Sequence, residues 1–234
     1  MKKYSLTNNT RQWLGITLFQ IKAECDFGNV LKGDLGGWIE KEENLSQDGN
    51  AWVYGNALVY GNAQVSDNAR VSGNALVYDN ALVYGNAQVY GDAQVYDDAR
   101  VYGNAQVSGD ARVYGNARVY DDAQVYDNAL VYGNAQVSDN ARVCGDARVS
   151  GNARVSGNAM VFGKLQLTAG YFFGHKEKTE DIKCFSLGDD SDYELIGKGD
   201  CEVGEENNQK TELLKKAQEL IDKAQELKEE ANKL

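Results

Sequence analysis

Histidine and cysteine supply most of the bases, nucleophiles and metal ligands of proteins, and this chain of 234 residues has few of them. Its single histidine is His175, and its four cysteines are Cys25, Cys144, Cys184 and Cys201. His175 with Cys184 or Cys201 could form a base and nucleophile pair, but nothing in the sequence orients such a pair. The cysteines have neither the spacing of a zinc site nor the density of a disulfide scaffold. We therefore predict no catalytic residue, no bound cofactor and free thiols, with Cys144 as an exposed thiol that points outward.

Aspartates recur through the middle of the chain and could supply oxygen ligands to calcium. One column comprises Asp67, Asp79, Asp97, Asp121, Asp127 and Asp139, and the neighbouring column includes Asp92, Asp98, Asp110, Asp122 and Asp146. At these positions aspartate interchanges with glycine or asparagine. All three residue types tolerate left-handed backbone angles and form turns. The pattern therefore predicts corners of the chain, and we expect no metal site.

A repeat of six residues sets the spacing of these corners. Valine occupies every sixth position from Val53 to Val161, and alanine stands two residues earlier, from Ala51 to Ala159. Residues two apart in an extended segment point to the same face, so valine and alanine share one face of a short strand. Each hexapeptide is then a strand followed by a two-residue corner. One such strand cannot bury its valine, so the repeats must stack into a solenoid.

Six residues per side and three sides give a coil of 18 residues. The repeat resembles that of hexapeptide-repeat proteins, which place a small residue two positions before an aliphatic one. The resemblance implies an all-β solenoid, a left-handed triangular parallel β-helix. Acyltransferases of this fold use a histidine on a coil as general base, and its carbonic anhydrases need three histidines around zinc. Because the repeats contain no histidine, we expect that the protein is not an enzyme, and acyltransferase activity remains an alternative.

Two segments beside the regular repeat sharpen the resemblance. The first is Lys32–Ser46, which continues into Gly49–Val53, and the second is Leu167–Gly174. Both are similar to YdcK-like hexapeptide-repeat proteins of bacteria and their prophages. The resemblance implies a phage or prophage setting. The start of the chain has no apolar signal core, so we expect the protein in the cytoplasm of the bacterial host cell.

The composition divides the chain into four parts. Residues 1–50 form an N-terminal cap that leads into the solenoid, with a strand over Gly15–Ala23, and residues 51–164 form the repeat. We expect residues 165–208 to form a small acidic β cap and residues 209–234 to form an amphipathic α-helix. The helix has a heptad seam: Leu213, Ala217, Leu220, Ala224, Leu227, Ala231 and Leu234. It could pack on its own solenoid or mediate self-association, and residues 211–234 could be native or an added tail.

The three-sided coil sorts the outward residues into three faces, because every eighteenth residue stacks on the one below. The first face carries an unbroken tyrosine column with leucines beside it: Tyr60, Tyr78, Tyr96, Tyr114 and Tyr132, with Leu58, Leu76 and Leu130. The second face carries Tyr84, Tyr102 and Tyr120, and on the third face tyrosine alternates with serine. Tyrosine is enriched in interface hot spots, and exposed apolar patches mark contacts. We therefore predict that the first face binds a protein partner; the other interpretation is that the rings only stabilise the coils.

Charge narrows the choice of partner. The net charge is −11, and residues 171–208 alone contain eleven acidic and four basic residues. This excess disfavours direct binding to nucleic acid, and no apolar run is long enough to cross a membrane. We favour a non-catalytic interaction or scaffold protein that forms a homo-oligomer. The alternative is a phage-encoded inhibitor that binds a host defence protein, through the tyrosines or through the acidic segment as a nucleic-acid mimic.

Overall fold

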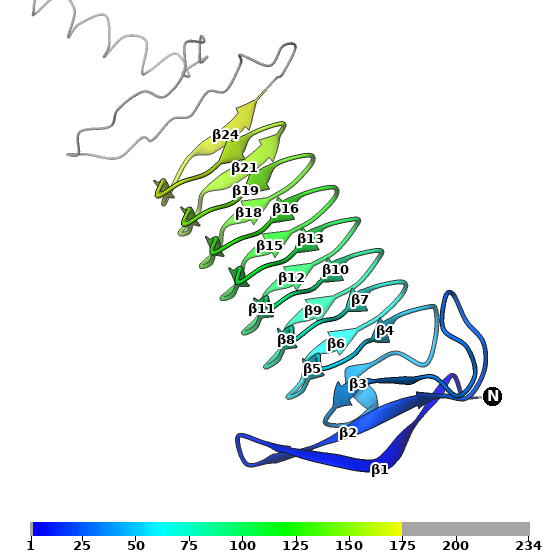
Figure 1. Ribbon diagram of the computed structural model, residues 1–234. Helices are drawn as coiled ribbons and strands as arrows, with labels where there is room; N and C mark the ends of the chain where they lie inside the picture. The colour runs from blue at the N-terminus through cyan, green and yellow to red at the C-terminus, as the bar shows by residue number, and fades with distance from the viewer. Residues whose placement is uncertain (1, 175–234) are drawn as a thin grey trace, which may run out of the picture. The chain divides into compact units, whose positions relative to one another are not determined.

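The computed structural model describes residues 2–174, which begin with a β-hairpin and then wind into a parallel β-solenoid (Figure 1). The N-terminal elements are β1 (Tyr4–Trp13), β2 (Ile16–Ala23), β3 (Leu35–Ile39) and the short 3-10 helix η1 (Glu42–Asn44). The strands of the coils follow: β4 (Trp52–Val53), β5 (Leu58–Val59), β6 (Gln64–Val65), β7 (Arg70–Val71), β8 (Leu76–Val77), β9 (Leu82–Val83), β10 (Gln88–Val89), β11 (Gln94–Val95), β12 (Arg100–Val101), β13 (Gln106–Val107), β14 (Arg112–Val113), β15 (Arg118–Val119), β16 (Gln124–Val125), β17 (Leu130–Val131), β18 (Gln136–Val137), β19 (Arg142–Val143), β20 (Arg148–Val149), β21 (Arg154–Gly157), β22 (Met160–Val161), β23 (Gln166–Leu167) and β24 (Tyr171–Gly174).

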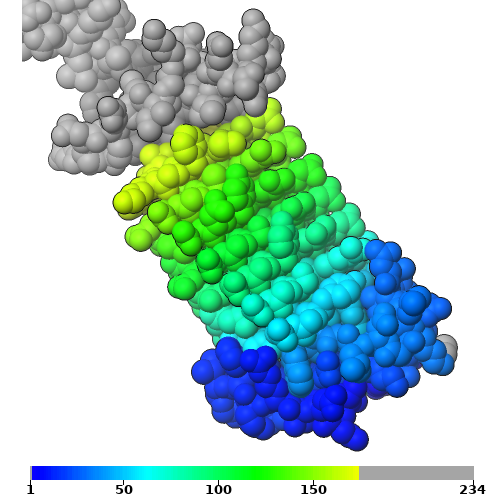
Figure 2. All heavy atoms as spheres, in the orientation of Figure 1, coloured from blue at the N-terminus to red at the C-terminus, as the bar shows by residue number. Residues whose placement is uncertain are grey.

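Three sheets form the sides of the solenoid. The first sheet has the order β1-β2-β3-β5-β8-β11-β14-β17-β20-β23, the second β6-β9-β12-β15-β18-β21-β24 and the third β4-β7-β10-β13-β16-β19-β22. Parallel pairing joins residues 18 apart, as in Val95 with Val113 and Val101 with Val119. The predicted coil of 18 residues is therefore confirmed. Figure 2 shows these coils following one another from the N-terminal cap, in blue, to the last described coil, in yellow.

The valine and alanine columns fill the interior of the coils. Every sixth-position valine from Val53 to Val161 and every alanine from Ala51 to Ala159 is buried. The intervening outward residues donate backbone hydrogen bonds to the next coil, as from Arg100 N to Ala117 O at 2.9 Å. Burial of one valine side chain stabilises the fold by about 1.5–3 kcal/mol, and each hexapeptide contributes one such valine. The side-chain directions predicted from the six-residue period are confirmed.

The corner geometry explains why aspartate and glycine share a column. The residue after each outward tyrosine or serine has a positive φ, for example 73° at Gly91 and 57° at Asp97. Glycine adopts these angles without a steric penalty, and aspartate tolerates them. The aspartate also accepts a hydrogen bond from the glycine N–H one coil later, with Asp97 Oδ2 3.1 Å from Gly115 N and Asp67 Oδ2 2.9 Å from Gly85 N. These carboxylates shape the turns, as the interchange of residues indicated.

Asparagines at the second corner position form ladders along the solenoid. Asn86 Nδ2 donates to Asn104 Oδ1 at 3.0 Å, and Asn104 Nδ2 donates to Asp122 Oδ1 at 2.9 Å. Similar ladders at the other two corners reach Asp92 and Asp98. A carboxylate accepts hydrogen bonds but cannot donate one, so each of these three ladders ends at its aspartate. The sequence predicted the corners but not these directional contacts between them.

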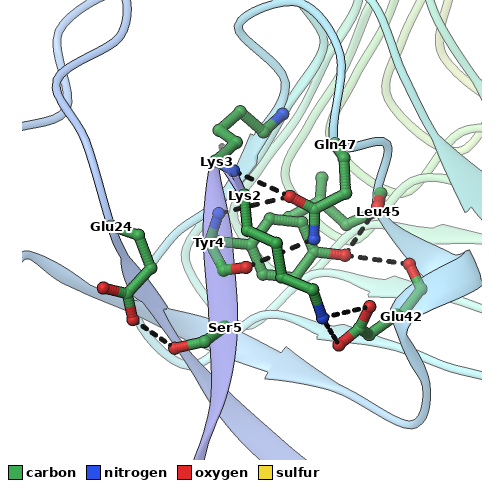
Figure 3. Close-up of polar contacts among 8 residues, drawn as sticks. All are labelled: Lys2, Lys3, Tyr4, Ser5, Glu24, Glu42, Leu45 and Gln47. Carbon is green, nitrogen blue, oxygen red and sulfur yellow. Dashed lines mark hydrogen bonds and ion pairs between the residues drawn. The ribbon is translucent and has the colours of Figure 1, made fainter.

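The N-terminal cap closes the first coil through Tyr4, which is fully buried on β1 (Figure 3). Its hydroxyl donates to the carbonyl oxygens of Glu42 and Leu45, at 2.8 and 2.6 Å. Gln47 Oε1 accepts the N–H of Lys3 at 2.9 Å, and Gln47 Nε2 donates to Tyr4 O at 3.2 Å. These contacts join residues about forty positions apart. They hold β1 in place, and no local pattern in the sequence announces them.

The predicted strand over Gly15–Ala23 is observed as β2, whereas β1 was not predicted. At the other end, β23 and β24 pair in parallel with β20 and β21, so the coils extend through Gly174, past the predicted start of the β cap at residue 165. The rest of that cap, 175–208, and the heptad segment 209–234 lie outside the described residues. His175, Cys184 and Cys201 lie there as well.

Candidate functional site: the outward faces of the coils

The first face presents the predicted tyrosine column as a continuous stack of rings, which we call the first ladder: Tyr60, Tyr78, Tyr96, Tyr114 and Tyr132. Successive ring centroids lie 4.9–5.0 Å apart, and the ring planes differ by 1–4°. The rings are half-buried because each covers its neighbours. Aromatic pairs at this separation contribute about 0.5–1.5 kcal/mol beyond the area they bury. The ladder is therefore a rigid surface whose rings are already ordered.

The ladder resists ionisation. Burial raises the pKa of Tyr78, and the neighbouring Tyr96 and Tyr60 raise it further. Burial and stacking also raise the pKa of Tyr96 and Tyr114, against an opposing effect of Arg112. A phenolate between two tyrosine rings would lose water on both sides, and the nearby arginine offsets this cost only in part. The raised pKa values keep the hydroxyls of Tyr78, Tyr96 and Tyr114 neutral at physiological pH, as donors and acceptors.

The leucines predicted beside the ladder differ in exposure. Leu76 and Leu130 are partly exposed, but Leu58 is only 1% exposed, so its assignment to a binding surface is wrong. Leu58 pairs with Trp38 on β3, which joins the N-terminal hairpin to the parallel strands of this sheet. The N-terminal cap therefore covers the start of the first face. On this face the partly exposed leucines begin at the next coil, with Leu76.

A hollow of about 440 Å³ lies between the cap and the start of the ladder, and sequence analysis did not find it. It is lined by Arg11, Trp13, Asn56, Leu58, Asn74, Leu76, Asp92 and Gln94. The Arg11 guanidinium lies 5.2 Å from the Trp13 ring, a cation–π contact. Burial raises the pKa of Tyr60 and an interaction with Trp13 lowers it, although Trp13 Nε1 has no partner at hydrogen-bonding geometry within residues 2–174. The indole thus lies close to Tyr60, the first ring of the ladder.

The second face has a shorter ladder and a different charge. The Tyr84, Tyr102 and Tyr120 rings stack at 4.9 and 5.0 Å. Arg100 and Arg118 are exposed on paired strands in direct register, and within the described part of the chain neither forms a salt bridge. Like charges in register repel each other. Two copies that met through this face would add two more arginines to the same contact, so the face is less suited to self-association than the first.

The third face has no continuous ladder. Ser72 and Ser108 separate Tyr54, Tyr90 and Tyr126 along the column. The column continues to Cys144, which we predicted as an exposed thiol. Cys144 is a free cysteine but only 9% exposed, so that prediction is wrong. The neighbouring Cys144, together with burial, raises the pKa of Tyr126 to about 12. The phenol thus covers the sulfur.

Two kinds of feature are absent from the described residues. Within residues 2–174, no group of three histidine, cysteine, aspartate or glutamate side chains could hold a metal ion. The same residues include no helix long and apolar enough to cross a bilayer. The only histidine of the sequence, His175, lies outside this range. The features that the structure brings together are therefore surfaces of stacked rings and ordered amides.

Fold and repeat define a class: the described chain is a parallel β-solenoid repeat protein. The family model for the YdcK β-solenoid repeat matches successive, partly overlapping segments: residues 51–67, 63–78, 75–91, 93–109, 111–122, 123–139, 135–151, 141–156, 147–163 and 153–166. The chain is a YdcK-like β-solenoid repeat protein. It is 39% identical over 62 residues to a protein of Escherichia coli (strain K12) named "Uncharacterized acetyltransferase YdcK". That match covers 23% of this chain and 19% of the relative, so the chain spans about a fifth of the relative's length.

Proposed function

We propose that the protein is a non-catalytic interaction module that self-associates through its first face. The observation that carries this proposal is the first ladder, which places five ordered tyrosine rings in one line. Ordering side chains on binding costs about 0.5–1.5 kcal/mol for each flexible side chain. Rings that their neighbours already hold avoid most of this cost. Tyrosine also supplies a large apolar contact with a polar hydroxyl at its edge.

A second copy of the chain fits this face better than a strongly charged partner does. The column beside the rings runs through Leu76, Gln94, Arg112 and Leu130, with one charged residue among four. A twofold interface uses the same patch on both subunits, so a near-neutral patch of rings and leucines can complement itself. The solenoid would then act as a rigid scaffold with its other two faces free.

The test is the mass in solution of two matched triple variants. Tyr78→Ser, Tyr96→Ser and Tyr114→Ser together remove the middle of the first ladder. Tyr84→Ser, Tyr102→Ser and Tyr120→Ser remove the same number of stacked rings from the second face and serve as the control. We expect the first variant to shift toward the monomer mass of 25.7 kDa in light scattering, while the second keeps the wild-type mass. Equal masses for all three proteins would contradict the proposal.

The heptad at 209–234 offers a second route to self-association, and it can be tested separately. Leu220→Glu and Leu227→Glu would place charges in the seam. If the first face is sufficient, the wild-type mass persists in this double variant. If the mass falls to that of the monomer while the first-face triple variant remains assembled, the helix and not the ladder holds the copies together.

An acetyltransferase is the second candidate function, and the printed name of the E. coli relative favours it. The sequence argues against a general base on the coils, because Val53–Val161 contains no histidine. Calorimetry with acetyl-coenzyme A separates the two candidates. We expect no saturable binding heat when acetyl-coenzyme A is titrated into the protein up to a concentration on the order of millimolar. A micromolar dissociation constant, together with acetyl transfer to an amine, would support the enzyme instead.

A further inference from the structure

The third face contains a gap where one ring of a ladder is missing. Tyr90 and Tyr126 belong to the same outward column, and Ser108 stands between them on the intervening coil. The strands before these residues, β10, β13 and β16, pair in strict register, Gln88 with Gln106 and Gln106 with Gln124. The backbone therefore continues without a break through the gap, and only the side chain at 108 differs from a complete ladder.

The width of the gap suits one aromatic ring. Neighbouring coils rise by about 4.8 Å, so the backbones at Tyr90 and Tyr126 lie about 10 Å apart along the solenoid. In the complete ladders of this protein, ring centroids lie 4.9–5.0 Å apart. A ring placed over Ser108 would thus lie about 5 Å from each tyrosine, within the range of stacked aromatic pairs.

The gap is an open hollow and not a collapsed surface. Its volume is about 260 Å³, and it is lined by Tyr90, Gln106, Ser108, Gly109, Gln124, Tyr126 and Asp127. Tyr90 is 38% exposed, more than any tyrosine of the two complete ladders, because a serine covers it where a ring would. Tyr126, on the other side, is partly buried, and Cys144 follows it in the column on the next coil. An apolar ring surface therefore faces solvent beside a space that could receive a second ring.

Polar groups line the gap beside the rings. Gln106 and Gln124 precede Ser108 and Tyr126 by two residues and line the same hollow. The Tyr90 hydroxyl donates to Gln106 Oε1 at 3.4 Å, a long contact that a better donor could replace. Primary amides both donate and accept, so they suit a ring that carries an N–H or O–H at its edge.

We propose that the gap between Tyr90 and Tyr126 binds the indole or phenol ring of a tryptophan or tyrosine side chain from a protein partner. The inserted ring completes the column by stacking between the two tyrosines, and its N–H or O–H bonds to Gln106 or Gln124. A phosphate-bearing aromatic ligand fits less well, because Asp127 borders the hollow and the chain carries a net charge of −11. This site is separate from the first face, so it does not depend on self-association.

The experiment is an NMR titration of the full-length protein with N-acetyl-tryptophanamide. Ring currents should shift the amide signals of Ser108 and Gly109, with a dissociation constant on the order of millimolar, since one inserted side chain supplies few contacts. Ser108→Tyr fills the gap with the residue that the complete ladders use, and it should weaken binding at least about tenfold. Ser66→Tyr is the matched control: it adds a ring below Tyr84, at the end of a ladder, and should leave binding unchanged.

Two further ligands complete the design. N-acetyl-leucinamide has no ring and should produce no saturable shift at Ser108. Adenosine monophosphate tests whether a nucleobase occupies the gap instead. The proposal is overturned if the shifts persist in Ser108→Tyr, if they are absent from the wild type, or if the nucleotide binds as tightly as the tryptophan amide.

Discussion

The first and third faces share one scaffold and differ in their outward residues, above all in the column that carries the tyrosines. On the first face every coil from Tyr60 to Tyr132 contributes a stacked ring. On the third face Ser72 and Ser108 interrupt the column, and a hollow opens at Ser108. The valine and alanine columns behind both faces are equally buried. Because the interior and the corners fix the fold, the outward column is free to vary, and it decides whether a face is closed and flat or open to a ring.

The largest change removes the scaffold on which both faces depend. Val101→Asp would place a carboxylate in the dry interior, without a partner, and we expect a loss of more than about 4 kcal/mol or a failure to fold. Arg100→Asp is the control, because the neighbouring side chain points outward and is exposed. Its stability should stay within about 0.5 kcal/mol of the wild type. Urea denaturation measures both; similar losses in the two variants would refute the assignment of inward and outward columns.

The next largest effect on stability is expected when a tyrosine of the first ladder is replaced by serine, or a serine of the third-face column by tyrosine. Tyr96→Ser removes a ring that stacks on Tyr78 and Tyr114, and we expect a loss of about 1–3 kcal/mol. Ser108→Tyr adds a ring between Tyr90 and Tyr126 and should stabilise the protein by up to a similar amount. Tyr132→Ser, which removes only the stack on Tyr114, should cost about half as much as Tyr96→Ser. If Ser108→Tyr destabilises the chain, the gap is too narrow for a ring.

Alkaline pH should weaken the complete ladder in particular. An unfolded tyrosine ionises near pH 10, whereas the raised pKa values of Tyr78, Tyr96 and Tyr114 keep the folded rings protonated. The folded state then binds more protons than the unfolded state, so stability is full below pH 10 and falls as pH rises through the folded pKa values. Urea denaturation at pH 9 and pH 11 should show this fall, and the first-face triple variant should show less of it. A fall of equal size in both proteins would assign the effect to other groups.

Lys3 in the N-terminal cap changes the pH dependence of stability in the opposite direction, and it does so at lower pH. Burial lowers the pKa of Lys3 from 10.5 to about 8, with opposing contributions from Asp48 and Cys25. Between these two values the unfolded chain holds a proton that the folded chain has released, so stability increases with pH. Comparing Lys3→Met with the wild type at pH 7 and pH 9 isolates this term. The variant should lack the increase; an identical increase in both would place its origin elsewhere.

The smallest expected change concerns the corners. Asp97→Asn keeps a residue that tolerates positive φ and an oxygen that can accept the Gly115 N–H, so stability should change by less than about 0.5 kcal/mol. Calcium should not alter the melting temperature of either protein if the aspartates serve the turns. A melting temperature that rises with calcium in the wild type and not in the variant would show that a metal binds at this corner.

The sequence predicted what depends on the six-residue period. The period determines the strands and the buried columns, because each coil repeats the same local choice. The resemblance to hexapeptide-repeat proteins adds the three sides, from which the 18-residue coil and the tyrosine ladder follow. The ring distances and the open state of the gap at Ser108 could not be obtained this way. They depend on the side-chain conformations and packing of Gln106, Gln124 and Tyr126, which the repeat pattern does not specify.

The N-terminal cap was predicted less well, because its structure depends on contacts that do not repeat. In β1, Thr7–Gln12 is a polar run without an apolar alternation, so nothing local marks it as a strand. Its position depends on Tyr4 reaching carbonyl oxygens of Glu42 and Leu45. The same long-range packing covers Leu58, which the repeat pattern alone assigned to the surface. A periodic sequence pattern does not predict contacts that occur only once in the structure.

The most direct test of the central claim is hydroxyl-radical footprinting read by mass spectrometry at increasing protein concentration. If copies of the chain meet through the first face, Tyr78, Tyr96 and Tyr114 lose reactivity as the assembly forms. Tyr84, Tyr102 and Tyr120, with the same stacking and similar exposure, should keep theirs. Protection of the second-face tyrosines, or no concentration dependence on either face, would contradict the account.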